Sequence, residues 1–116
     1  IDLFEEQVTS NPNSIAISMG KISLTYFELD KKVNSFSSYL TNIVGKCSVV
    51  GLLAKHSIET LIAILGILKS GNAYLPIDPD HPTERIKFML EDSNVSCLFT
   101  NLDNIDFFQK EKTIFL

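Results

Sequence analysis

Two aspartates two positions apart are the first residues whose types and spacing could do chemistry. Asp78 and Asp80 flank Pro79, and closely spaced carboxylates can hold a divalent cation or share acid–base work. Aspartate and proline are also turn formers, and an aspartate side chain in a turn accepts a hydrogen bond from a nearby backbone amide. We therefore predict that Asp78 and Asp80 cap a loop, and we expect no metal site.

The two histidines have no partner of a matching kind nearby in the sequence. His56 follows Lys55 at the end of an expected strand, where parallel sheets often carry functional groups. A single imidazole without a neighbouring Cys, His or carboxylate is usually solvated or simply hydrogen-bonded. His81 directly precedes an expected helix. We expect neither histidine to be catalytic.

The remaining reactive residue types are equally dispersed. Cys47 and Cys97 lie far apart without a CxxC spacing, so we predict two small buried side chains in a reducing cytosol. The five glycines form no phosphate-binding loop. Arg85 can pair with Glu84, Asp92 or a segment outside this sequence. The sequence thus predicts no catalytic, cofactor-binding or metal-binding residue.

Charge and hydropathy exclude two classes of protein. The formal net charge is -4 and Arg85 is the single arginine, whereas proteins that bind phosphate backbones need clustered lysines and arginines. The longest apolar run covers residues 61–68, and a membrane-spanning helix needs about 20 such residues. The first residues contain no basic segment followed by an apolar run, so we expect no secretory signal. We expect a cytoplasmic protein without nucleic-acid or membrane partners.

A short helix and a hairpin are expected at the start of the chain. Asp2 can cap the helix, whose apolar side is formed by Leu3, Phe4 and Val8. Residues 15–18 and 22–24 have the composition of short strands. Gly20 between them supplies the permissive backbone of a tight turn, which predicts a β-hairpin.

A longer helix follows the hairpin. Thr25 and Glu28 have the spacing of a capping box, and Gly45 marks the turn after the helix. Apolar residues recur at steps of four, three and four, namely Leu29, Val33, Phe36 and Leu40. This periodicity places them on one buried stripe, with residues 30–32 facing away.

The rest of the chain alternates strand and helix patterns. Strands are expected at residues 47–53, 74–77, 95–100 and 113–116. A helix over 58–69, capped by Ser57 and ended by Gly71, is apolar nearly all round and should be central. Another helix opens at Pro82, with Ile86, Met89 and Leu90 inside. The expected fold is α/β, with a β-hairpin followed by a mainly parallel sheet and helices on both faces.

Two segments resemble core motifs of nonribosomal peptide synthetase adenylation domains. Residues 24–29, LTYFEL, match the form L-T-Y-x-E-L, and residues 68–78, LKSGNAYLPID, are similar to L-K-A-G-x-A-Y-V-P-I-D. Ser70 and Leu75 are mild departures. Residues 79–86 are also similar to the continuation of the second motif. Two motifs in order at a fitting separation are far more specific than one.

The resemblance implies the fold and the activity of the parent protein. It implies an incomplete piece, residues 1–116, of the large N-terminal subdomain of adenylate-forming enzymes. Such domains use ATP and Mg²⁺ to activate an amino acid as aminoacyl-AMP, then load it onto the phosphopantetheine of a carrier domain. The implied partners are the remainder of the adenylation domain and the peptidyl carrier and condensation domains. The family's phosphate loop, substrate pocket and catalytic lysine come later, so the chain itself should be inactive and bind no cofactor.

Several alternatives remain open at this point. Within the motifs, Thr25, Glu28 and Gly71 are explained as helix ends, and Tyr74 as a half-buried ring. The parent could be another adenylate-forming ligase, such as an acyl-CoA synthetase or an aryl-acid activator. A flavodoxin- or receiver-like binding module is the alternative of another class, although residues 54–56 lack the acidic group of a receiver. As an isolated piece, the chain should expose apolar faces such as that of residues 58–68, and it should be marginally stable or self-associate.

Overall fold

Helices and strands alternate along the chain in the order expected for an α/β protein. A computed structural model describes residues 2–102, 108 and 112–116. Its helices are α1 (Asp2–Ser10), α2 (Tyr26–Val44), α3 (Ile58–Lys69) and α4 (Thr83–Asp92). Its strands are β1 (Ile15–Met19), β2 (Ile22–Thr25), β3 (Val49–Leu53), β4 (Ala73–Ile77), β5 (Cys97–Thr100) and β6 (Thr113–Phe115).

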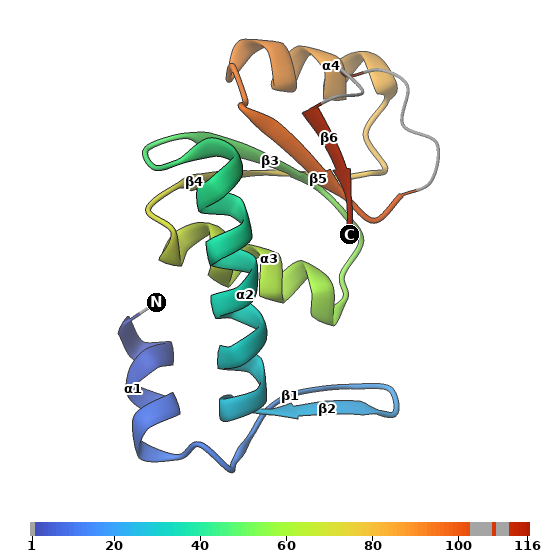
Figure 1. Cartoon of the computed structure of the whole chain (residues 1–116). Coiled ribbons are helices and arrows are strands. Elements are labelled where there is room, and N and C mark those ends of the chain that lie inside the picture. Colours follow the sequence, from blue (N-terminus) through green and yellow to red (C-terminus); the bar gives the residue numbers. More distant parts are fainter. Residues whose placement is uncertain (1, 103–107, 109–111) are drawn as a thin grey trace.

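The strands form two separate sheets (Figure 1). Strands β1 and β2 pair as an antiparallel hairpin, and Gly20 in its turn has a φ of 61°, which glycine adopts without strain. The main sheet has the order β4-β3-β5-β6, and every neighbouring pair is parallel. The predicted hairpin followed by a parallel sheet is therefore confirmed.

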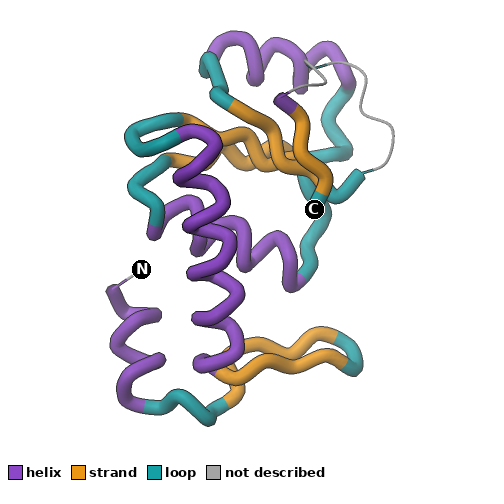
Figure 2. Tube along the Cα trace, viewed as in Figure 1, coloured by secondary structure: helices purple, strands orange, loops and turns teal. Residues whose placement is uncertain are grey.

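Helices cover both faces of the main sheet (Figure 2). On one face, Val50 and Leu52 of β3 pack with Leu40 of α2 and with Ala63 and Ile67 of α3. The other face packs against α4 through a second cluster, made of Leu53, Ile77, Ile86, Leu90, Val95 and Leu98. Successive strand residues point to opposite faces, so the uniformly apolar β3 serves both layers, as its sequence predicted.

Three of the helix ends are those that the sequence predicted, whereas α4 begins at Thr83 and Pro82 occupies the cap position before it. The hydroxyl of Thr25 accepts from the Glu28 amide, and the Glu28 carboxylate accepts from the Thr25 amide. The Ser57 hydroxyl accepts from the Thr60 amide at the start of α3. Gly71 follows α3 with a φ of 83°, a backbone conformation that favours glycine.

The start of the chain differs from the prediction in two residues. Asp2 is the first residue of α1 instead of its cap. Leu3 is 80% exposed, while Phe4 packs against the cluster formed by Leu24, Leu29, Val33 and Ile58. A nine-residue helix that touches one neighbouring surface buries only a narrow stripe, and Leu3 lies outside it.

Two further predictions about burial are wrong. Cys47 is exposed and precedes β3, with a φ of 60° and its amide donating to the Gly71 carbonyl at 3.0 Å. This turn joins α2 to the sheet, so the strand begins only at Val49. Asp30 does not face away from the protein, because it turns toward Lys69 of α3.

Helix α3 lies in the middle of the layered structure, as its all-round apolar sequence predicted. It packs against both the sheet and α2, and five of its residues are buried. Leu68, at 40%, is its one exposed large hydrophobic residue. The expectation that residues 58–68 present an exposed apolar face is therefore wrong, because α2 and the sheet already cover it.

Candidate functional site

A hollow of about 620 Å³ lies beside the carboxyl ends of β3 and β4. Its apolar lining comes from Leu52, Ala54, Ile64, Pro76 and Ile77. Its polar lining comes from the loops after the two strands and from α3: Lys55, His56, Thr60, Asp78, Asp80 and His81. The carboxyl edge of a parallel sheet is where α/β proteins bind their ligands.

The loop after β3 is held in place by side chains from two other elements. The Asn101 amide group, just after β5, accepts from the Lys55 amide at 3.0 Å and donates to the Lys55 carbonyl at 3.1 Å. The Thr60 hydroxyl donates to the same carbonyl at 2.7 Å. These bonds fix the backbone of Lys55 and so set where its neighbour His56 lies.

The loop after β4 has the conformation that its aspartates predicted. The Asp80 amide donates to the Asp78 carboxylate at 2.8 Å, and the His81 amide donates to the Asp78 carbonyl at 3.1 Å. Both aspartates are exposed. The Asp78 side chain therefore closes a turn, which confirms the predicted loop cap.

Four polar residues, whose proximity the sequence did not predict, lie around the same hollow. His56, Asp78, Asp80 and His81 all border the same hollow. Among the described residues, neither imidazole makes a hydrogen bond or an ion pair, and no group of three or more His, Cys, Asp or Glu could hold a metal ion. The sequence could have indicated this grouping only because the residues follow two neighbouring parallel strands. That inference requires the strand order, which the sequence does not show.

The two matched motifs lie at the ends of helices (Figure 1). Residues 24–29 contain the capping box of α2. The pKa of the Glu28 carboxyl is lowered by its hydrogen bonds with Thr25, first of all the one from the Thr25 amide, and to a smaller extent by the charge of Lys32. Residues 68–78 span the end of α3 and the whole of β4. Tyr74 is half-buried against the core, as predicted.

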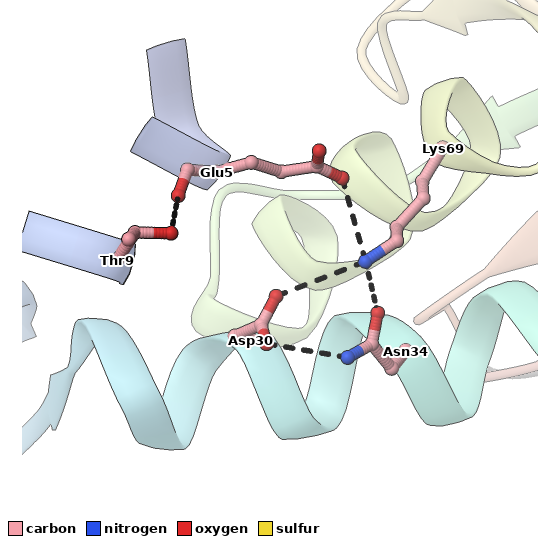
Figure 3. Close-up of polar contacts among 5 residues, drawn as sticks. All are labelled: Glu5, Thr9, Asp30, Asn34 and Lys69. Carbon is pink, nitrogen blue, oxygen red and sulfur yellow. Dashed lines mark hydrogen bonds and ion pairs between the residues drawn. The ribbon is translucent and has the colours of Figure 1, made fainter. Parts of the chain in front are cut away.

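The second motif also contains a lysine with a role that the sequence did not indicate. Lys69 Nζ lies 3.5 Å from Glu5 Oε1 and 3.8 Å from Asp30 Oδ1, and it donates to Asn34 Oδ1 (Figure 3). These partners come from α1 and α2. No local spacing could have identified them, since Glu5 and Lys69 meet only in the folded chain.

The two cysteines differ in exposure and in acidity. Cys97 is buried in β5, and loss of solvation raises the pKa of its thiol to about 11. A thiol with such a pKa stays protonated and unreactive near neutral pH. Cys47 lies on the surface, so only one of the two predicted buried cysteines is buried.

The family of the chain follows from a sequence profile described as AMP-binding enzyme, which matches residues 4–114. The chain belongs to the AMP-binding enzyme family. This membership favours the ligase interpretations over the flavodoxin- or receiver-like module. Within the described part of this family member, no helix has the length and the apolar content needed to cross a membrane.

Curated relatives of this AMP-binding enzyme chain include bacterial synthases. Tyrocidine synthase 3 of Brevibacillus parabrevis is 50% identical over 95 residues, which cover 81% of this chain and 2% of that protein. Zwittermicin A synthase ZmaJ of Bacillus cereus is 43% identical over 108 residues, or 92% of this chain and 21% of that protein. The chain thus spans a small part of the relatives that it matches.

Solved structures agree on the fold of this family member. The N-terminal subdomain of NpsA from Klebsiella oxytoca, in complex with 3-hydroxybenzoyl-AMSN, matches with a TM-score of 0.87 and 21% identity over 98% of this chain and 29% of that one. NpsA-ThdA, an artificially fused adenylation-PCP di-domain from the same organism, matches with a TM-score of 0.86 and 20% identity over 98% of this chain and 22% of that one. The architecture is therefore that of the N-terminal subdomain of adenylate-forming enzymes.

Proposed function

We propose that the chain is the N-terminal part of an amino-acid-activating adenylation domain of a nonribosomal peptide synthetase. The observation that carries this proposal is the family match over residues 4–114 together with the synthases among the relatives. The two motifs at residues 24–29 and 68–78 add to it. The parent protein would join an amino-acid carboxylate to the α-phosphate of ATP, release pyrophosphate, and pass the aminoacyl group to a carrier thiol with loss of AMP.

The residues of this chain would supply the scaffold of that domain and none of its chemistry. The five glycines lie in separate turns, strands and helices, so they build no cradle for the phosphates of ATP. The lining of the hollow carries Lys55 and two histidines together with Asp78 and Asp80, and no hydrogen bond or ion pair among the described residues joins these side chains into a site. We therefore assign no catalytic, cofactor-binding or metal-binding role to the described residues.

The partners follow from the same proposal. Residues 1–116 would form one incomplete domain that folds against the remainder of the adenylation domain. A peptidyl carrier domain would receive the activated amino acid, in line with the adenylation-PCP pair seen in NpsA-ThdA, and condensation domains would use it. The parent would act in the cytoplasm on a free amino acid, without nucleic acid or membrane partners.

Exchange of label between pyrophosphate and ATP tests the proposed reaction. A longer polypeptide that carries this sequence in its own reading frame is offered the proteinogenic amino acids, a set of aryl acids and a set of fatty acids in turn. We expect exchange that depends on one amino acid. Exchange that depends on an aryl or fatty acid would instead assign the parent protein to the aryl-acid activators or acyl-CoA synthetases. That result would overturn the amino-acid proposal.

A further inference from the structure

Helix α1 is attached to the rest of the protein by few contacts. None of its nine residues is buried. Its main apolar contact is Phe4, which packs against the cluster of Leu24, Leu29, Val33 and Ile58 and whose ring centroid lies 6.2 Å from that of Tyr26. An element with so little buried apolar surface can open at a much lower free energy than the core.

The segment that follows α1 is fixed more firmly than α1 itself. The Phe27 amide donates to the Pro12 carbonyl at 2.9 Å, and the Tyr26 amide donates to the Ser14 carbonyl at 3.0 Å. Both acceptors are thereby tied to the first turn of α2. Pro12 cannot continue the hydrogen bonding of α1. A movement of α1 would therefore turn about the backbone of Asn11 and Pro12. The chain from the Pro12 carbonyl onward would keep its place.

One ion pair joins α1 to the other helices. Among residues 2–102, 108 and 112–116, the pair of Glu5 and Lys69 is the single ion pair between α1 and the rest of the protein. Glu5 is partly exposed, and its carboxylate lies 3.5 Å from Lys69 Nζ (Figure 3). Such a pair is screened by salt, because water reaches both charges.

Lys69 also has partners outside α1. Asp30 and Asn34 of α2 both contact Lys69 Nζ, and the Asn34 amide donates to Asp30 Oδ2 at 3.2 Å. None of these contacts involves Glu5, so release of α1 would leave Lys69 with partners on α2.

We propose that α1 is a detachable arm, held by Lys69 through Glu5, that swings out about Asn11 and Pro12 while the sheet stays folded. Its release uncovers the part of the apolar cluster that lies under Phe4. The lysine of the second motif thereby acts as a positioning residue for the start of the domain. The proposal concerns the fold alone and does not depend on which substrate the parent protein activates.

Hydrogen exchange on the 116-residue chain tests the arm directly, with Glu5→Gln as the variant. At low ionic strength, we expect the α1 amides to exchange about two- to fivefold faster in Glu5→Gln than in the parent, which is the range for one exposed ion pair. The β3 amides should not change. Sodium chloride at about 1 M should bring the parent to the rate of the variant, because it screens the pair.

Two further variants make the test decisive. Glu6→Gln removes the neighbouring carboxylate, which has no partner among the described residues, and should leave α1 exchange at the parent rate. Lys69→Met should speed α1 exchange at least as much as Glu5→Gln, and combining the two should add nothing. The proposal is overturned if Glu5→Gln and Glu6→Gln behave alike, or if α1 and β3 exchange together at one rate in every variant.

Discussion

At the scale of single residues, the Thr25 hydroxyl has the most clearly defined role. It accepts the Glu28 amide at 3.1 Å and so satisfies one of the free donors at the start of α2. We predict that Thr25→Ala lowers the free energy of unfolding by about 1 kcal/mol, measured by urea denaturation. Thr25→Ser keeps the oxygen and should cost much less. Equal losses in the two variants would show that the methyl group matters and the cap does not.

The other half of the capping box makes stability depend on pH. Hydrogen bonds from Thr25 and the charge of Lys32 lower the pKa of Glu28 from its ordinary value of 4.5. Because the folded pKa lies below the unfolded one, this contribution is fully present above about pH 4.5 and is lost as the pH falls through the folded pKa. The urea midpoint of the parent should therefore exceed that of Glu28→Gln near neutrality, with the gap closing on acidification. A gap that stays constant down to pH 3 would refute this role.

The two thiols should react at very different rates. Burial raises the pKa of Cys97 to about 11, and Cys47 is exposed. We predict that an aromatic disulfide reagent modifies one thiol per folded chain and two in denaturant. Cys47→Ser should abolish the reaction of the folded chain, and Cys97→Ser should leave it intact. Fast labelling of Cys97 in the folded chain would contradict the buried position of β5.

At the scale of elements, the packing of α2 on α3 depends on a close approach at Gly66. A Cβ atom there would lie 2.5 Å from Cδ1 of Phe36, and the Phe36 ring is itself held against Phe99 at 5.1 Å between centroids. We predict that Gly66→Ala lowers the free energy of unfolding by about 1–3 kcal/mol through overpacking, although alanine favours a helix by about 1 kcal/mol.

A second variant at this contact checks the cause. Phe36→Leu shortens the side chain that Gly66→Ala would strike, so the double variant should lose less stability than the sum of the single losses. Leu68→Ala, on the exposed side of α3, serves as the control and should change stability little. Strict additivity of Gly66→Ala and Phe36→Leu would mean that the clash is not the cause.

Local signals in the sequence were sufficient to predict the elements and some of their ends, although β3 and β5 each begin two residues later than expected. The capping box at Thr25 and Glu28 and the glycine at Gly71 act within a few residues, so the sequence alone shows them. The place of Cys47 and the partners of Lys69 depend on how α1, α2 and α3 meet, which no local pattern records. The hollow was missed for the same reason, because His56 and His81 come together only through the order of β3 and β4.

At the scale of the whole molecule, the surface retains large apolar side chains and open sheet edges. Phe27, Tyr39 and Phe88 are each about half exposed or more, and β4 and β6 form the edges of the sheet. We predict that the 116-residue chain self-associates, seen as a sedimentation coefficient that rises with concentration. Phe88→Ser and Tyr39→Ser should weaken this rise, with Thr9→Ser as a matched surface control. A monomer with a sharp, concentration-independent unfolding transition would contradict the prediction.

The central claim is that this chain supplies the scaffold of an adenylating enzyme and that residues outside it supply the chemistry. The most direct test is amino-acid-dependent ATP–pyrophosphate exchange, measured side by side on the 116-residue chain and on the longer polypeptide that contains it. We predict no exchange from the short chain and clear exchange from the long one. Exchange by the short chain alone would show that catalytic groups lie among these residues. A folded but silent long polypeptide would contradict the proposed activity itself.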